Sequence, residues 1–187
     1  MNAIILHGRP GKEEYFDGNQ PSASNSHWIS WLQNQLMTKG IKADTPECPD
    51  AYEPQYNVWL KEVERFDIHK DTILVGHSTG GGFWIRYLSE HPDLQVRKIV
   101  LVAPWLNVKK EDGTKFFDFD FNPEIIRQTE TLTILSSDND AQDIRDSVDF
   151  LRNKIPSAKF IDFHNYGHFC YEDLGTEAFP ELLEECL

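Results

Sequence analysis

Two patterns of hydrophobic and polar positions follow each other in turn along the chain. Short apolar runs rich in β-branched residues predict six buried strands: Ala3–Leu6, Ile41–Ala43, Thr72–Val75, Lys98–Val102, Leu132–Leu135 and Lys159–Phe163. Apolar residues at helical spacing predict helices between them: Asn25 or Ser26 to Leu36, Tyr56 to Phe66, Phe83 to Leu88, Asp143–Asn153 and Thr176–Cys186. Strands that alternate with helices require a parallel sheet covered on both faces. We therefore expect one α/β domain over residues 1–187 with about six parallel strands.

Two segments depart from this alternation. Residues 9–24 are rich in Gly, Pro, Ser and acidic residues, which predicts a loop. Residues 104–122 have no clear period but carry five large rings: Trp105, Phe116, Phe117, Phe119 and Phe121. These rings either complete the core or cover the carboxyl edge of the sheet. The acidic residues between Phe117, Phe119 and Phe121 favour a cap with one apolar and one acidic face.

A candidate nucleophile lies between a predicted strand and a predicted helix. Gly76-His77-Ser78-Thr79-Gly80 matches the G-x-S-x-G pattern of a nucleophile elbow in the context that such a turn requires. Small residues two positions before and after the serine let the backbone turn sharply. A phosphate-binding loop would need a Lys after its last glycine, and this chain has none there. Ser78 is therefore the predicted nucleophile.

Acid and base candidates follow two later strands, in the order Ser, Asp, His that α/β-hydrolases use. Asp138 and Asp140 come after Leu132–Leu135, and His168 comes after Lys159–Phe163. We expect His168 to take the serine proton and an aspartate to orient its ring. His164 competes with His168, but it lies one residue beyond its strand and is expected to pack locally. The spacing alone leaves the choice between the two aspartates open.

The turn after the first strand supplies a candidate oxyanion hole. His7-Gly8-Arg9-Pro10 closes that strand, and Pro10 has no N–H to donate. The backbone N–H groups of Arg9 and Thr79 are therefore the expected pair of donors.

The composition indicates which binding partners and which cellular compartment to expect. The net charge of −13 opposes binding to nucleic acids and to anionic membrane surfaces, and no basic run offsets it. Three scattered cysteines indicate a reducing compartment rather than a disulfide scaffold, and they lack metal-site spacing. The N-terminal sequence lacks signal-peptide features, and no apolar run is long enough to span a membrane. We expect a cytoplasmic protein that needs no cofactor or metal; no pattern indicates an oligomeric state.

Several motifs resemble the family of small serine hydrolases that includes retinoblastoma-binding protein nine and YdeN-like bacterial proteins. The matching stretches are Ile5-Leu6-His7-Gly8, His27-Trp28 with Trp31, Trp59-Leu60, Val75-Gly76-His77-Ser78, Ile99-Val100-Leu101-Val102, Ser137-Asp138-Asn139-Asp140 and Gly167-His168-Phe169. The resemblance implies an α/β-hydrolase fold and serine hydrolase activity, and it places the catalytic acid at Asp140. The chain departs from the family at Ala141-Gln142-Asp143-Ile144. It also lacks the L-x-C-x-E motif for retinoblastoma protein, so that partner is not expected.

Two functions are consistent with these residues. The first is an esterase-like enzyme that cleaves a small carboxylic ester, thioester or amide through Ser78, His168 and Asp140. The second is a binding or regulatory protein that keeps these residues but turns over little substrate. The complete set of three residues favours the enzyme.

Overall fold

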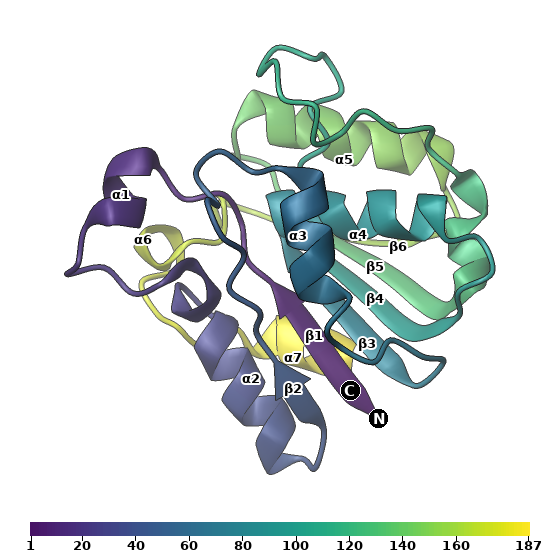
Figure 1. Cartoon of the computed structure of the whole chain (residues 1–187), viewed down its shortest axis with the longest axis horizontal. Coiled ribbons are helices and arrows are strands. Elements are labelled where there is room, and N and C mark those ends of the chain that lie inside the picture. Colours follow the sequence, from purple (N-terminus) through teal and green to yellow (C-terminus); the bar gives the residue numbers. More distant parts are fainter.

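The sheet at the centre of the molecule contains six strands, and every neighbouring pair is parallel. The computed structural model describes residues 1–187, and its strand order is β2-β1-β3-β4-β5-β6 (Figure 1). The strands are β1 (Asn2–Leu6), β2 (Lys42–Asp44), β3 (Thr72–His77), β4 (Val96–Val102), β5 (Thr129–Ser137) and β6 (Lys159–Phe163). The predicted α/β class and the six parallel strands are confirmed.

Helices cover both faces of this sheet (Figure 1). The α-helices are α1 (Lys12–Phe16), α2 (Ile29–Thr38), α3 (Tyr56–Val63), α4 (Thr79–Glu90), α5 (Gln142–Lys154), α6 (Tyr171–Leu174) and α7 (Pro180–Cys186). Two short 3₁₀ helices are η1 (Ala23–Asn25) and η2 (Pro123–Gln128). Helices α2 and α7 pack on one face, and α3, α4 and α5 pack on the other.

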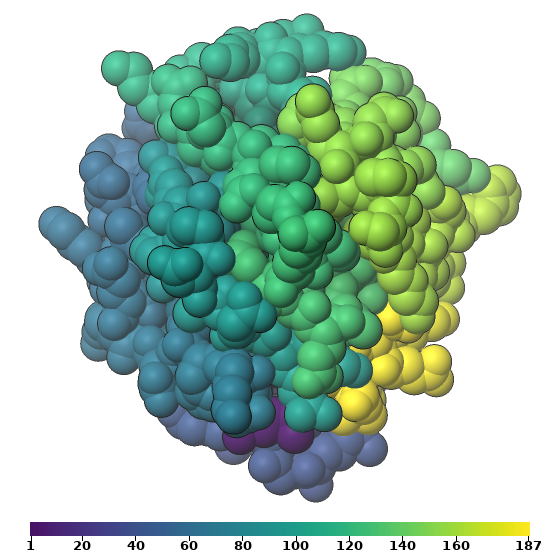
Figure 2. Space-filling model, turned by 90° about the vertical axis from the view of Figure 1, so that its right-hand side faces the viewer, coloured from purple at the N-terminus to yellow at the C-terminus, as the bar shows by residue number.

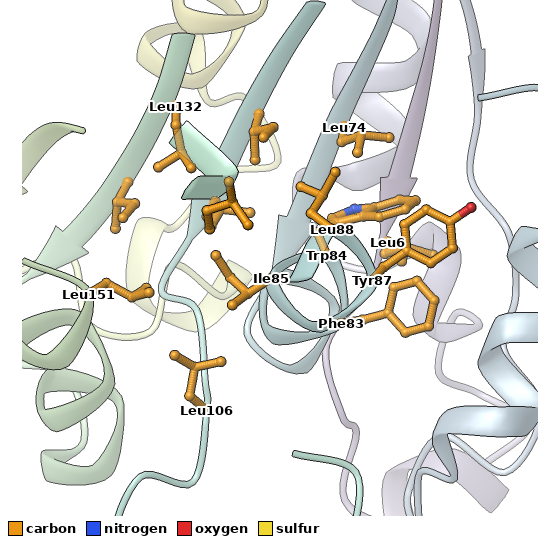
Figure 3. Packing of buried hydrophobic residues seen from close by; sticks show 14 of the residues in the cluster. Leu6, Leu74, Phe83, Trp84, Ile85, Tyr87, Leu88, Leu106, Leu132 and Leu151 are labelled. Atoms are coloured by element: carbon orange, nitrogen blue, oxygen red, sulfur yellow. The ribbon is translucent and has the colours of Figure 1, made fainter. Parts of the chain in front are cut away.

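The alternation of side chains along each strand builds the two halves of the core. In β1, Ile4 and Leu6 point into the cluster that contains α3, α4 and α5, whereas Ala3 and Ile5 point into the cluster that contains α2 and α7. Figure 3 shows Leu6 and other buried residues gathered around Trp84 of α4. The Trp84 indole N–H donates to the Val75 carbonyl at 2.8 Å, so its one polar atom has a partner inside the core.

The two ends of the chain lie close together at the amino edge of the sheet. Figure 1 shows both end labels beside β1 and α7. In the side view of Figure 2, purple atoms of the N-terminus and yellow atoms of the C-terminus meet at the bottom of the molecule. None of the helices has both the length and the apolar character that crossing a bilayer requires.

The predicted loop over residues 9–24 is wrong in part, because it contains α1 and η1. Helix α1 buries none of its residues, so no apolar stripe marks it in the sequence. The next helix starts at Ile29 rather than after Asn25 or Ser26. His27 has a φ of +57°, in the left-handed region, and this conformation prevents the helix from starting earlier.

The predicted closing helix is also shorter than expected. Helix α7 begins at Pro180 instead of Thr176, and Pro180 occupies its first turn. The residue before a proline avoids the helical region, and Phe179 has a φ of −133° and a ψ of 75°. Helix α6, which has four residues, was not predicted.

Four of the five rings of residues 104–122 pack against the core, so the prediction of a cap is wrong for them, whereas Trp105 borders a hollow beside Ser78. Phe116 is 1% exposed and packs on Trp59 and Tyr56 in the core. Phe117 and Phe119 are half-buried against the same core cluster. Phe116, Phe117, Phe119 and Phe121 pack against the core cluster that contains α3, α4 and α5, because burying large apolar area against a packed face is more favourable than leaving it over a polar cleft.

A glycine at position 80 is required by the approach of α4 to β1. A Cβ atom at Gly80 would lie 2.5 Å from the His7 carbonyl oxygen and 2.7 Å from that of Leu6. Gly80→Ala should therefore lower the free energy of unfolding by about 3 kcal/mol, through backbone overpacking. Urea denaturation measures the change, with Gly18→Ala as the control, because nothing lies within 4 Å of a Cβ at Gly18. Equal stability of the two variants would contradict this close approach.

Candidate active site

Ser78 sits in the sharp turn between β3 and α4, as predicted. Its φ of 52° and ψ of −116° are unusual for a residue with a side chain. Three backbone hydrogen bonds hold the turn: the Ser78 N–H donates to Val102 at 2.9 Å, and the Ser78 carbonyl accepts from Gly82 at 3.1 Å and Trp105 at 3.0 Å. Surrounding structure of this kind is what maintains a strained residue. The turn also requires a residue without a side chain at Gly76, since a Cβ there would lie 2.6 Å from the backbone of Gly80.

His168 and Asp140 meet at the carboxyl edge of the sheet. His168 Nδ1 lies 3.0 Å from both carboxylate oxygens of Asp140. The Asp140 side chain is 2% exposed, and the His168 side chain is 30% exposed. A carboxylate can only accept, so Nδ1 carries a hydrogen and Nε2 is left free. Ser78 and His168 border the same cavity of about 250 Å³.

Asp138 belongs to a different network. Its carboxylate accepts the Asn165 N–H at 3.0 Å and pairs with the His164 ring. The Asn165 N–H and His164 together lower the pKa of Asp138. The structure therefore brings Asp140, and not Asp138, to His168. Asp138 instead holds the start of the loop that follows β6. His164 contacts Asp138, but its side chain is 80% exposed, so the expectation that it packs locally is wrong.

Arg9 and Thr79, which carry the two predicted oxyanion donors, border the same hollow as Ser78. Neither the Arg9 N–H nor the Thr79 N–H donates to an acceptor in the protein. Gly8 brings the first turn against the serine, since a Cβ at Gly8 would lie 3.2 Å from Ser78 Cβ. The Arg9 side chain is held by the Tyr52 carbonyl at 2.9 Å and by Asp112 at 2.8 Å.

His7 fixes the turn that carries Arg9, a role that the sequence did not reveal. The ring is fully buried; Nδ1 lies 2.7 Å from the Gly8 carbonyl, and Nε2 lies 3.0 Å from the Cys48 N–H. A carbonyl accepts and an N–H donates, so the hydrogen is on Nδ1. The only signal in the sequence was a histidine directly after a buried strand.

Two hollows flank the candidate nucleophile, and Arg9, Ser78 and His168 border both of them. The first is polar and is lined on its far side by Glu14, His27, Cys170 and Glu172, among others. The second, of about 480 Å³, includes the apolar side chains of Trp105, Ala141 and Ile144. A substrate bound at Ser78 would thus have one polar and one partly apolar neighbourhood.

His27, Cys170 and Glu172 are close enough together to suggest a metal site. His27 Nδ1, however, accepts the Tyr171 N–H at 3.1 Å, so Nε2 carries the ring hydrogen and neither nitrogen offers a free lone pair. Burial and nearby carboxylates raise the pKa of the Cys170 thiol to about 12. As arranged, these residues do not form a metal-binding set.

Comparison with known proteins identifies the family. A family model for serine hydrolases matches residues 16–185, which is most of the chain. The chain belongs to the serine hydrolase family. YdeN of Bacillus subtilis (strain 168) is 28% identical over 188 residues, covering 90% of this chain and 91% of YdeN. The serine hydrolase RBBP9 of Rattus norvegicus is 26% identical, covering 86% of this chain and 88% of RBBP9.

Solved structures agree on the fold. The crystal structure of the Bacillus subtilis ydeN gene product matches this serine hydrolase with a TM-score of 0.77 at 24% identity, over 97% of this chain and 94% of the other. ATU1826 of Agrobacterium tumefaciens, attributed to the α/β hydrolases, matches with a TM-score of 0.57 at 19% identity, over 98% and 81%. The α/β-hydrolase fold, the family resemblance and the expectation of an enzyme are confirmed.

The lowered pKa values of three histidines predict how the free energy of unfolding depends on pH. Burial lowers the pKa of His7, His27 and His77 below the ordinary 6.5. Below pH 6.5 these histidines bind protons in the unfolded chain but stay neutral in the folded protein. The free energy of unfolding therefore falls as the pH is lowered below 6.5. Each histidine contributes up to about 1.4 kcal/mol per pH unit.

Urea denaturation at pH 7.5, 6.5 and 5.5 measures this loss. His7→Gln should lessen the slope below pH 6.5 by about 1.4 kcal/mol per pH unit, because one titrating group is gone. A free energy of unfolding that stays constant from pH 7.5 to 5.5 would show that the three rings are not held neutral.

Proposed function

We propose that this serine hydrolase cleaves a small carboxylic ester, thioester or amide through an acyl-enzyme on Ser78. The observation that carries the proposal is the contact of His168 Nδ1 with both oxygens of the buried Asp140 carboxylate, at 3.0 Å each. This contact leaves His168 Nε2 free on the cavity that Ser78 also borders. A base that is oriented by a buried carboxylate and lies beside a serine in a sharp strand-to-helix turn is the arrangement that acyl transfer requires.

The first half of the reaction forms the acyl-enzyme. His168 Nε2 takes the proton of Ser78 Oγ as Oγ bonds to the substrate carbonyl carbon, and the carbonyl electron pair moves onto oxygen. The Arg9 and Thr79 N–H groups stabilise that oxygen, helped by the amino end of α4. The carbon–leaving-group bond then breaks, and His168 returns its proton to the leaving group. Asp140 stabilises the imidazolium between these steps.

The second half releases the acid. Water gives a proton to His168 Nε2 as its oxygen bonds to the acyl carbon, and the proton returns to Ser78 Oγ when the ester bond breaks. Ser78 Oγ and His168 are not hydrogen-bonded to each other in the structure. The proposal therefore requires that the serine hydroxyl and Nε2 come within hydrogen-bond distance in the substrate complex.

Ser78→Ala should abolish turnover and covalent labelling. The wild type should react with one equivalent of a fluorophosphonate probe and should hydrolyse p-nitrophenyl acetate, because both reactions need the Ser78 hydroxyl. The variant should do neither, while it unfolds at the same temperature as the wild type, since losing one hydroxyl leaves little cavity. Intact mass spectrometry and absorbance at 405 nm are the measurements.

Two results would contradict the proposal. Labelling or turnover that persists in Ser78→Ala would place the nucleophile elsewhere. A wild type that neither reacts with the probe nor turns over a panel of esters, thioesters and amides of increasing acyl length would favour the binding protein.

The two aspartates provide a matched pair for the identity of the acid. Asp140→Asn should lower kcat by about 10⁴-fold, because an amide cannot stabilise the imidazolium or fix the ring tautomer. Asp138→Asn should change kcat by less than about 10-fold, since that carboxylate contacts His164 and Asn165 instead. Steady-state kinetics with the same ester decide between them. The reverse order would assign the acid to Asp138.

A further inference from the structure

Both backbone polar groups of His168 are held by side chains. The His168 N–H donates to Asp173 Oδ2 at 2.8 Å. The His168 carbonyl lies 2.8 Å from His77 Nε2. His77 directly precedes Ser78, so this second bond joins the peptide of the candidate base to the nucleophile turn. The N–H and the carbonyl of His168 are thus each held by a different side chain.

His77 is built to donate this hydrogen bond. A carbonyl can only accept, so the hydrogen of the ring is on Nε2. The side chain is 2% exposed. Its ring lies edge-on to Trp28 with centroids 5.6 Å apart and tilted against the His168 ring at 4.9 Å. Burial and the neighbouring histidines lower the pKa of His77 well below 6.5, so the ring stays neutral and its donor does not change with pH.

Asp173 of α6 holds the other side of the loop. Its Oδ2 atom accepts from the N–H groups of His168 and Cys170, at 2.8 Å and 3.1 Å. The carboxylate lies directly against the peptide at Gly167, where a Cβ would be 2.1 Å from Asp173 Oδ1. No other side chain accepts the His168 N–H.

The loop needs such partners because its own backbone is strained. Asn165, Gly167 and Phe169 have φ values of +62°, +52° and +59°, so three of five successive residues are left-handed. Glycine and asparagine adopt that region at little cost, but a residue such as Phe169 persists there only when its surroundings hold it. His168 lies between two of them, and its ring position depends on the bonds that its own peptide groups make.

We propose that His77 and Asp173 are positioning residues that hold His168 in reach of Ser78. Neither side chain touches the reacting atoms; each acts through the backbone of His168. This inference rests on the proposed function, because it takes His168 to be the base. It assigns a role to the residue before the nucleophile and to a carboxylate outside the Ser78, His168 and Asp140 set.

The test compares two variants at each position. His77→Phe keeps a ring in the pocket but removes the donor, whereas His77→Gln keeps an N–H donor of similar reach. Asp173→Ala removes the acceptor, whereas Asp173→Asn keeps one oxygen. His77→Phe and Asp173→Ala should each lower kcat for p-nitrophenyl acetate by about 100-fold with KM within about 2-fold, because a small displacement of a catalytic group costs that much. The Gln and Asn variants should recover at least 10-fold of the loss.

Controls separate positioning from folding. All assays are run at least 15 °C below the unfolding temperature of each variant, so a loss of stability alone leaves kcat unchanged. Glu177→Gln, which removes an exposed carboxylate from the same part of the chain, should match the wild type. The double variant His77→Phe/Asp173→Ala should lose less than the product of the single losses, because both bonds hold the same residue, His168.

The outcomes distinguish this proposal from the one on which it rests. If Ser78→Ala is inactive while His77→Phe and Asp173→Ala keep the wild-type kcat, the positioning role is overturned and the proposed function stands. If the Phe and Ala variants are folded and slow but the Gln and Asn variants recover nothing, the hydrogen bonds are not the cause, and the role is overturned as well. If Ser78→Ala is active, the proposed function itself fails.

Discussion

The close approach of three backbones at the carboxyl edge of the sheet is the constraint on which the site depends. Gly80 of α4 lies against the carbonyls of Leu6 and His7 at the end of β1, and Gly76 lies against Gly80. Because these positions have no side chains, only Ser78 separates the end of β3 from the start of α4. That geometry leaves Ser78 at a tight turn, and Arg9, Ser78 and Thr79 border one hollow. The positions of the proposed nucleophile and of the proposed oxyanion donors are thus consequences of one packing condition.

Most of the fold could be predicted because its central strands are buried. Strands β1, β3, β4 and β5 contribute alternate residues to both core clusters, so apolar runs such as Thr72–Val75 stand out from the polar segments around them. The order of Ser78, Asp140 and His168 was predictable for the same reason, because each follows such a strand. The distinction between Asp138 and Asp140 was not available from spacing, since it depends on which carboxylate turns inward after β5.

The remaining features depend on contacts that have no sequence period. Helix α1 has no buried face, and the late start of α2 follows from the left-handed His27. The rings of residues 104–122 have the spacing of a cap, but Phe116 finds a better environment among Trp59 and Tyr56. A local sequence pattern does not show which environment a ring will occupy. Two apolar environments compete for the same side chain, and only the packing of the whole core decides between them.

The histidines around the cavity divide into two roles according to their partners. His7 and His77 are buried and His27 is half-buried, and none of them has a hydrogen-bonded carboxylate. Their pKa values are lowered, and each uses a fixed tautomer to hold a different loop: the turn at Gly8, the start of α6 and the loop at His168. His168 alone among these four contacts a buried carboxylate. The four imidazoles therefore differ in their partners. Three of them hold loops through fixed tautomers, and His168 is the one whose ring is oriented by a carboxylate, which is why the proposed function assigns the base to it.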